Sequence, residues 1–498
     1  MRWYTLMGIL VLGMVVITGR LFWLTVINGD EALARAEGNR IEWVELPAPR
    51  GIIYDRQGEA LVRNIPGEKP NQVKREYVYG VAMAHILGYV GESDGFGKMG
   101  VEQWLDNQLR GQDGAEIVET GADGSLRRLG RREPVVGEEV RLTIDAGLQR
   151  KVTEVLADRK GGVVATTPQT GEILALASSP GFDPNLFSGQ LSVNSNQEKQ
   201  IILTSPDKPL FNRVTDGVYA PGSIFKLVTA VAGLETGKID AATRIEDTGE
   251  IRVGEFRYGN WYFDQYGKLE GSVDIVRALG RSNDIFFYRV GEMVGAQGVA
   301  DWARRLGLGE SLSLGWAADS AGLVPDPAWK EKFKGERWFL GNTYHLAIGQ
   351  GDVGVTVLQI NLMTGAIGNG GKLCSPVISN QLSVISCQEL GISQKTLELV
   401  RQGMKAACSP KGTAFPLFDF EPVVACKTGT AQHGGKLSLP HAWITILAPG
   451  DPPAGGPEVA LTVLLEAAGE GSYEAAPVAK EILEYWFKER QGMTLRPG

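Results

Sequence analysis

The sequence predicts an α+β fold in which helices pack on one antiparallel sheet, preceded by a helix that crosses a membrane. Short β-rich runs occupy residues 162–178 and 423–466, and the region between them has a mostly helical pattern. Strands at both ends of a region with a helical middle indicate one shared sheet with a helical insertion. A single long apolar run near the N-terminus predicts the membrane helix.

The composition is that of a large folded protein. The chain has 498 residues, of which 43% are hydrophobic and 22% charged, so it can bury a large core and form more than one domain. Its formal net charge of −8 gives no indication of nucleic-acid binding. The four histidines form no H-E-x-x-H motif or similar cluster. We therefore expect no metal and no other cofactor.

The apolar run covers residues 3–27 and is the only stretch that is long and apolar enough to cross a bilayer. Arg20 interrupts it near one end, where a long side chain reaches the membrane interface. Arg2 precedes the run, and Asp30 and Glu31 follow it. The positive-inside rule therefore predicts a single-pass protein of the cell membrane, with a cytoplasmic N-terminus and the bulk of the chain outside the cytoplasm.

A cleaved signal peptide is the alternative interpretation of this run, because A-x-A patterns occur at residues 32–34 and 34–36. The run is longer than the apolar core of an ordinary signal peptide, and the alanines lie in a stretch of helical pattern. We therefore expect an uncleaved anchor.

The strand predictions come from short β-rich runs that are bounded by turn residues. The first two runs are joined by P-Q-T-G-E, which predicts a hairpin, and a helix at residues 475–490 closes the fold. The predicted strands cover residues 162–167, 173–178, 423–431, 442–448 and 459–466.

A predicted helix over residues 223–234, ending near Gly237, is apolar on nearly all sides, which is typical of a helix buried inside a domain. Ser223 and Lys226 share one face of it, so the lysine amine can reach the serine hydroxyl. Burial of Lys226 would push its pKa down, towards that of a usable general base. A lysine that reaches the surface from a core helix is the alternative. A second S-x-x-K at residues 205–208 is flanked by prolines that argue against a helix.

Two further motifs decide between these interpretations. Ser282-Asn283-Asp284 and Lys427-Thr428-Gly429 follow the S-x-x-K motif, and this order is the signature of penicillin-binding proteins and related serine β-lactamases. The sequence resembles the class B penicillin-binding proteins along nearly its whole length. That resemblance implies a penicillin-binding transpeptidase domain whose antiparallel sheet is packed by helices and carries an all-helical insertion, behind an elongated, mostly β pedestal.

The resemblance also implies a catalytic cycle. Ser223 would attack the carbonyl of the penultimate D-Ala in a D-Ala-D-Ala stem peptide, Lys226 would take its proton, and Ser282 would relay protons between Lys226 and Lys427 and the departing D-Ala. An amine from a neighbouring stem peptide would then resolve the acyl-enzyme and form a cross-link. A β-lactam would mimic the substrate and stay attached to Ser223.

The same resemblance assigns the binding groups. Lys427 and Thr428 would bind the substrate carboxylate, Gly429 completes the K-T-G motif, and the backbone N–H groups of Ser223 and Thr430 would hold the oxyanion. These residues form one site with Lys226 and Ser282 only if the fold brings together positions that are far apart in the sequence.

Asp284 departs from the usual triplet, because most of the superfamily carries asparagine there. An aspartate at this place is familiar in penicillin-binding protein 2, the elongation-type branch, and a carboxylate near two lysines is electrostatically reasonable. Residues 336–360 are similar to a segment of that branch as well. The alternative interpretation of Asp284 is a damaged site.

The pedestal resemblance rests on residues 49–56, 77–91 and 97–111. About a dozen residues separate Asn64 from Tyr77, where the family usually has a sizeable head subdomain, so we expect a trimmed pedestal. The expected organisation is an anchor at residues 1–27, a pedestal at 28–140, a transpeptidase domain at 141–490 and a tail at 491–498.

Residues 1–48 leave no room for a glycosyltransferase domain, so we expect a monofunctional enzyme that acts on stem peptides and lipid-linked precursor polymer, with β-lactams as inhibitors. For this family a separate membrane polymerase of the SEDS type, and other membrane proteins of the elongation complex, are the expected partners. Two alternatives stay open: a D,D-carboxypeptidase or β-lactamase that uses the same serine, and a catalytically silent scaffold of the wall-synthesis complex.

The four cysteines allow three disulfide pairings in an oxidising compartment. Cys374 with Cys387 would close a small loop and would leave Cys408 with Cys426, and free buried thiols are the alternative. Strand alternation points Cys426 away from Lys427, so we expect it to pack rather than to react. Two other features receive no catalytic role. His433 and His441 lack triad spacing. The basic cluster at residues 127–132 is expected in a solvated loop, and contact with anionic lipid or wall material is the alternative.

Overall fold

The computed structural model describes residues 2–38, 41–67, 73–92, 94–121, 125–189, 195–381, 384–435, 438–452 and 455–490. The expected tail at residues 491–498 lies outside these ranges. The chain divides into two compact units: one comprises Met1–Gly51, Asn64–Val73 and Asn107–Glu138, and the other comprises Ile52–Arg63, Lys74–Asp106 and Glu139–Gly498.

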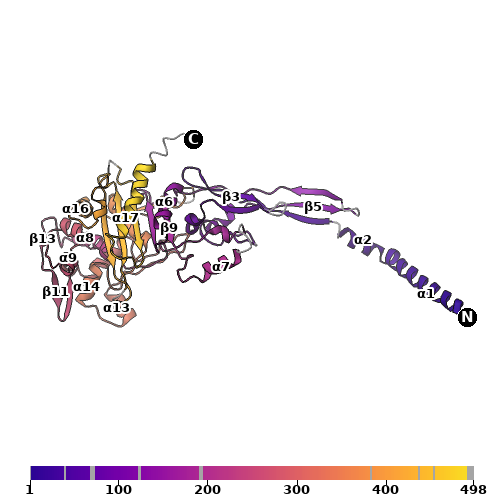
Figure 1. Ribbon diagram of the computed structural model, residues 1–498, viewed down its shortest axis with the longest axis horizontal. Helices are drawn as coiled ribbons and strands as arrows, with labels where there is room; N and C mark the ends of the chain where they lie inside the picture. The colour runs from indigo at the N-terminus through magenta and orange to yellow at the C-terminus, as the bar shows by residue number, and fades with distance from the viewer. Residues whose placement is uncertain are drawn as a thin grey trace. The chain divides into compact units, whose positions relative to one another are not determined.

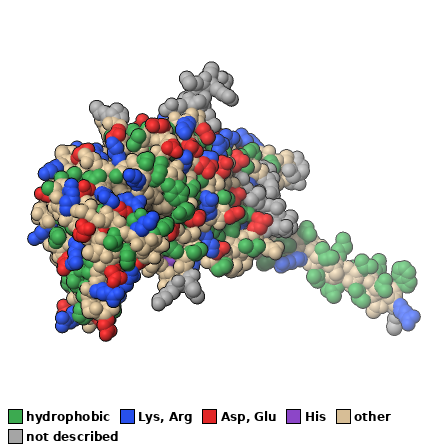
Figure 2. Space-filling view, turned by 60° about the vertical axis from the view of Figure 1, so that its left-hand side comes forward, with side chains coloured by type: hydrophobic (Ala, Val, Ile, Leu, Met, Phe, Trp, Pro, Cys, Tyr) green, Lys and Arg blue, Asp and Glu red, His purple; other side chains and the backbone are tan. Residues whose placement is uncertain are grey.

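The first unit begins with helix α1 (Arg2–Phe22), a π-helical turn (Trp23–Ile27) and helix α2 (Gly29–Gly38). Residues 2–27 are long and apolar enough to span a membrane, and Figure 2 shows hydrophobic side chains along the N-terminal helix. The Arg20 guanidinium lies 4.4 Å from the centre of the Trp23 ring, within the range of a cation–π contact.

The same unit contains an antiparallel three-stranded sheet in the order β1-β5-β6. Its middle strand β5 is labelled in Figure 1. Its strands are β1 (Ile41–Leu46), β5 (Gly114–Thr120) and β6 (Leu126–Arg132). The expectation of a loop at the basic cluster is wrong, because Arg127, Arg128, Arg131 and Arg132 lie on β6. They are exposed on that strand, and Arg128 pairs with Glu116 of β5.

The second unit carries most of a small sheet with the order β4-β3-β2-β7. Short helices come after β4 in the chain, and the buried Arg75 Nε donates a 2.7 Å hydrogen bond to Glu102 on one of them. The strands are β2 (Ile53–Tyr54), β3 (Ala60–Pro66), β4 (Val73–Tyr77) and β7 (Val140–Arg141). The helices of the second unit are η2 (Gly80–Met83), α3 (Ala84–Leu87) and α4 (Gly100–Trp104). Helix α5 (Asp106–Leu109) belongs mostly to the first unit.

The main sheet of this unit has five antiparallel strands in the order β16-β17-β18-β8-β9. The predicted hairpin and the predicted C-terminal meander therefore share one sheet, as the sequence indicated. The strands are β8 (Gly161–Thr166), β9 (Ile173–Ser179), β16 (Ala425–Ala431), β17 (His441–Ala448) and β18 (Val459–Leu465).

Helices cover both faces of the main sheet (Figure 1). Helices α6 (Ala146–Leu156) and α17 (Ala475–Glu484) share one hydrophobic core with alternate residues of the strands. Helix α15 (Val357–Gly368) covers the other face, where Asn361 Nδ2 donates to Ala460 O at 2.9 Å. The predicted closing helix is confirmed, with a π-helical turn (Tyr485–Glu489) at its end.

The expectation of an all-helical insertion is wrong, because the segment between β9 and β16 is mainly helical but also contains two-stranded sheets. Its larger helices are α7 (Ser195–Thr204), α8 (Lys226–Glu235), α9 (Trp261–Tyr266), α10 (Ile275–Arg281), α11 (Asp284–Val294), α12 (Ala296–Arg305), α13 (Pro327–Lys334), α14 (Leu340–Ala347) and α16 (Gln394–Ala407). The strand pairs are β10 (Ile245–Asp247) with β13 (Gly271–Val273), β11 (Glu250–Val253) with β12 (Phe256–Gly259), and β14 (Lys372–Cys374) with β15 (Cys387–Glu389).

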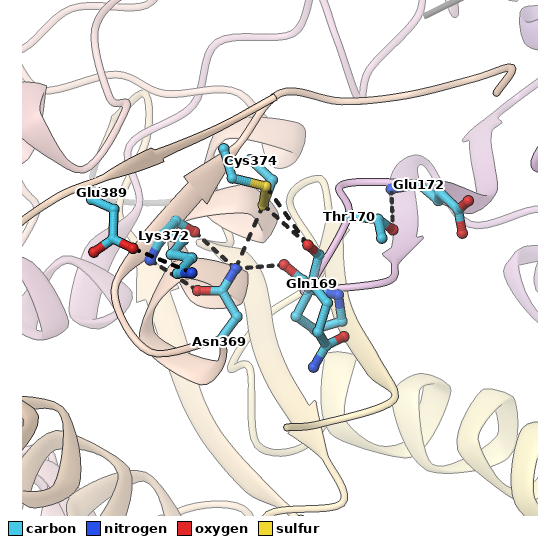
Figure 3. Close-up of a disulfide and its surroundings, with 9 residues drawn as sticks. Gln169, Thr170, Glu172, Asn369, Lys372, Cys374 and Glu389 are labelled. Carbon is cyan, nitrogen blue, oxygen red and sulfur yellow. Dashed lines mark hydrogen bonds and ion pairs between the residues drawn. A yellow bond between two sulfur atoms is a disulfide. The ribbon is translucent and has the colours of Figure 1, made fainter. Parts of the chain in front are cut away.

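All four cysteines lie in the described part of the chain and are paired, so the free-thiol alternative is wrong. One disulfide joins Cys374 to Cys387 across β14 and β15 (Figure 3), beside Asn369 Nδ2, which donates to Pro168 O at 2.6 Å. The other joins Cys408, at the end of α16, to Cys426 of β16. Cys426 is fully buried in the sheet core, which confirms a packing role.

Candidate active site

Ser223 lies on a 3-10 turn (Gly222–Phe225) that leads directly into α8. The predicted central helix is confirmed, with its first turn 3-10 rather than α-helical and with Gly237 at a φ of 66° just beyond its end. Residues 226–233 are all buried, as their apolar pattern predicted. Trp443 Nε1 of β17 donates to Ala220 O at 3.1 Å and ties the start of the turn to the sheet.

Two glycines let the Ser223 turn pack directly against β16. Gly222 has a φ of 54°, and a Cβ atom there would lie 2.8 Å from Thr430 O. A Cβ atom at Gly429 would lie 2.9 Å from Pro221 O and 3.1 Å from Ile224 Cγ1. Any larger side chain at either position would separate the serine turn from the strand that carries the K-T-G motif.

The Ser282 hydroxyl lies between the two lysines. Lys226 Nζ donates to Ser282 Oγ at 3.1 Å and to Ser282 O at 2.8 Å. Lys427 Nζ donates to the same Oγ at 3.0 Å and to Thr428 O at 2.9 Å. Ser282 has a φ of 53°, an unfavourable conformation for a serine, and it is held there at the junction of α10 and α11.

Asp284 is the carboxylate partner of Lys226. Lys226 Nζ lies 2.7 Å from Asp284 Oδ1, and the backbone N–H of Trp261 donates to Asp284 Oδ2 at 3.0 Å. Asp284 is also the first residue of α11, where the helix dipole favours a negative charge. The structure therefore gives this departure from the usual asparagine a defined electrostatic partner.

These residues open onto one cleft of about 1250 Å³. Its lining includes Ser223, Ser282, Asp284, Thr428 and Thr430. Lys226 and Lys427 are fully buried behind this lining and reach it through Ser282. Among the hydrogen bonds of the described residues, none joins Lys226 Nζ to Ser223 Oγ; the amine is held by Ser282 and Asp284 instead.

Comparison with known proteins identifies the family. The penicillin-binding protein transpeptidase domain matches residues 161–484, and the penicillin-binding protein dimerisation domain matches residues 68–142. The chain belongs to the penicillin-binding protein transpeptidases. The domain covers the whole main sheet and the helical insertion, so the predicted α+β fold and the resemblance to class B members are confirmed.

Individual relatives of this transpeptidase are of the penicillin-binding protein 2 type. It is 29% identical over 602 residues to the peptidoglycan D,D-transpeptidase MrdA of Haemophilus influenzae, covering 96% of this chain and 91% of the relative. It matches the Pseudomonas aeruginosa PBP2 structure with a TM-score of 0.77 and 29% identity, over 92% of this chain and 100% of that chain. A chain of a peptidoglycan synthase complex matches with a TM-score of 0.79 and 27% identity, over 100% and 99% of the two chains.

Burial sets the proton affinities of the two lysines in this transpeptidase. Burial lowers the pKa of Lys226 below its ordinary value, although the Asp284 charge and hydrogen bond act in the opposite direction. Burial and the nearby Lys226 charge hold the pKa of Lys427 well below its ordinary value. An amine with a lowered pKa can act as a base near neutral pH.

Sequence reasoning missed a buried carboxylate that organises the turn around Ser282. Asp247 is 1% exposed, and its Oδ2 accepts hydrogen bonds from Asn260 Nδ2 at 2.8 Å and from Asn283 Nδ2 at 3.0 Å. Asn260 Oδ1 in turn accepts from the backbone N–H of Asp284 at 3.1 Å. Nothing in the local sequence distinguishes Asp247 from a surface charge, because its partners are brought to it only by the fold.

The two histidines near the K-T-G strand stack on each other with ring centres 3.9 Å apart. His433 lines the cleft, while His441 packs edge-on against Tyr219 and accepts a 3.1 Å hydrogen bond from the backbone N–H of Ala467. Burial and the neighbouring His433 lower the pKa of His441 to about 4. His441 is thus neutral at physiological pH.

Proposed function

We propose that the chain is a serine-type peptidoglycan D,D-transpeptidase that cross-links stem peptides through an acyl-enzyme on Ser223. The observation that carries this proposal is the position of Ser282, whose hydroxyl accepts hydrogen bonds from both buried lysines at the cleft that Ser223 lines. The similarity to a peptidoglycan D,D-transpeptidase over 96% of the chain supports it.

In the acylation step, Ser223 Oγ attacks the carbonyl carbon of the penultimate D-Ala, and the proton of the hydroxyl passes to Lys226 Nζ. The C–N bond to the terminal D-Ala breaks, and the same proton moves from Lys226 through Ser282 to the departing nitrogen. The 3.1 Å hydrogen bond between Lys226 and Ser282 supports this relay. Hydrogen bonds to a nucleophile often tighten only when substrate binds, so the resting geometry at Ser223 is compatible with it.

The K-T-G strand supplies the binding groups. The substrate carboxylate binds at Lys427 and Thr428, and its negative charge raises the pKa of Lys427, so that the lysine gains a proton as substrate enters. The backbone N–H groups of Ser223 and Thr430 hold the oxyanion. The close packing of the Ser223 turn on β16, which Gly222 and Gly429 permit, supports this pairing of two backbone donors.

In the second step, a neutral amine of a neighbouring stem peptide attacks the ester carbonyl of the acyl-enzyme. A C–N bond forms, the bond from the carbonyl carbon to Ser223 Oγ breaks, and one proton of the amine returns through Ser282 and Lys226 to Oγ. The products are a cross-linked peptide and free enzyme.

The proposal includes a place for the protein in the cell. Residues 1–27 anchor it in the cell membrane with a cytoplasmic N-terminus, residues 28–140 form the pedestal, and residues 141–490 form the extracytoplasmic transpeptidase domain. A SEDS-type polymerase and other membrane proteins of wall elongation are its partners. The similarity to a chain of a peptidoglycan synthase complex and to MrdA supports a coupled role in elongation.

The function is tested with the full-length protein in detergent and a soluble peptide that ends in D-Ala-D-Ala. Release of D-Ala, and formation of an amide with an added amine acceptor, are both measured. We expect D-Ala release to be matched by amide formation at saturating acceptor, and both to be lost in Ser223→Ala. Release of D-Ala without amide at every acceptor concentration would show a hydrolase instead.

A further inference from the structure

The carboxylates that line the active-site cleft differ in their partners. Asp284 pairs with Lys226, and Asp264 pairs with Arg257. Glu470 is half-buried and accepts a 3.0 Å hydrogen bond from the neutral Gln265 side chain. Among the described residues, Glu470 is the one cleft-lining carboxylate that no lysine, arginine or histidine side chain pairs.

Among the residues that the structure describes, the charges around the cleft leave this carboxylate uncompensated. Arg257 also pairs with Glu250, so its single positive charge already serves two carboxylates. The lowered pKa of Lys427 favours a neutral amine there before substrate binds. A cleft with an excess of negative charge attracts cations and raises their local concentration.

Glu470 also has a fixed position beside the K-T-G strand. The backbone N–H of the next residue, Gly471, donates to Thr430 Oγ1 at 3.3 Å. A Cβ atom at Gly471 would collide with the backbone oxygens of Gly429 and Trp443, so the loop runs in direct contact with β16 and β17. Across the cleft, Gln265 belongs to α9 of the insertion. The carboxylate therefore lies close to the proposed reaction centre but outside the lysine network.

We propose that Glu470 binds a primary ammonium group of a stem peptide, the side-chain amine of a diamino acid, while that peptide reacts at Ser223. This inference rests on the proposed function. An ammonium has three N–H donors and a positive charge that pairs with the Glu470 carboxylate. It therefore replaces Gln265 as the hydrogen-bond donor or shares the carboxylate with it. Where the bound ammonium is the acceptor's own, it loses one proton to solvent water before it attacks as the neutral amine. Glu470 is a binding residue in this account and takes no part in proton transfer to Ser223.

Both the donor and the acceptor peptide carry such an amine, and the experiment separates the two sources. The full-length Glu470→Gln variant, which keeps the hydrogen-bonding shape and removes the charge, is compared with the parent. Glu474→Gln, four residues further along the same loop and outside the cleft lining, is the matched control. Donor peptides ending in D-Ala-D-Ala are used with a free and with an acetylated side-chain amine. The acceptors are a peptide amine, which is cationic, and hydroxylamine, which is uncharged at neutral pH.

We expect Glu470→Gln to raise KM about tenfold for the cationic member of either the donor pair or the acceptor pair, as loss of one charge-assisted contact implies. An effect on the acceptor pair assigns the site to the acceptor, and an effect on the donor pair assigns it to the donor. Unchanged KM values in all arms, equal changes for charged and uncharged partners, or an equal effect of Glu474→Gln would overturn the inference. Acylation by a penicillin without an amine should be unchanged in Glu470→Gln; failure of the parent to acylate would instead overturn the proposed function.

Discussion

Lys226 Nζ lies 2.7 Å from Asp284 Oδ1, and both residues contact the turn that holds Ser282. The carboxylate stabilises the protonated lysine and so opposes the lowering of the Lys226 pKa by burial. A lysine acts as a base only when it is neutral. Asp284 therefore raises the lowest pH at which the proposed base is available.

The first prediction concerns Asp284→Asn. Removing the carboxylate charge leaves burial unopposed, so the pKa of Lys226 falls further, and the acidic limb of the acylation rate moves to lower pH. The measurement is the rate of covalent labelling by a fluorescent penicillin as a function of pH. A limb that stays in place or moves to higher pH would be incompatible with Lys226 as the base.

The second prediction compares two glycines of positive φ that flank the same helix. Gly222→Ala should lower the acylation rate by about 10- to 100-fold, because its Cβ would press on Thr430 O and shift the Ser223 turn. Gly237→Ala meets the same backbone strain, of about 1 kcal/mol, but its Cβ has no atom within 4 Å. It should lose stability and keep its acylation rate. Equal rates for the two variants would show that close packing at Gly222 is not needed.

The third prediction concerns the disulfide between Cys408 and Cys426, which are 18 residues apart in the sequence. Replacing both by alanine should lower the free energy of unfolding by about 3 kcal/mol, because the unfolded chain gains conformational freedom. Denaturant unfolding of the oxidised protein measures it. The Cys374→Ala, Cys387→Ala pair is the control: it removes a disulfide of similar loop length away from β16, so it should lose stability with an unchanged acylation rate. Unchanged stability in both variants would mean that neither disulfide constrains the chain.

Local pattern in the sequence was enough to predict the elements that hold the site. The apolar run around Lys226 predicted a buried helix, and the β-rich runs predicted both the hairpin and the meander. Hydrophobic periodicity and turn residues are local features of the sequence, so they predict these helices and strands without knowledge of the fold. The loop expected at residues 127–132 was wrong because pairing with β5, which the cluster itself does not show, makes that segment a strand.

The contacts within the site depend on the whole fold and were less predictable. Ser223 and Lys427 are 204 residues apart (427 − 223), and only the sheet brings their segments together. The motifs indicated that Ser282 lies near both lysines. They did not indicate that Lys226 would donate a hydrogen bond to Asp284 and none to Ser223. The Asp247 network has no motif at all. The roles of Ser223, Lys226 and their neighbours, and the orientation in the membrane, stay predictions.

The most direct test of the account is covalent labelling of the full-length protein with a fluorescent penicillin, beside Ser223→Ala and Lys226→Ala. The account predicts a stable label on the parent, no label on Ser223→Ala, and labelling of Lys226→Ala slower by at least about 100-fold, the scale of a lost general base. Mass analysis of the digested parent should place the adduct on Ser223. A folded Ser223→Ala protein that still labels at the parent rate would contradict the central claim, because another residue would then be the nucleophile.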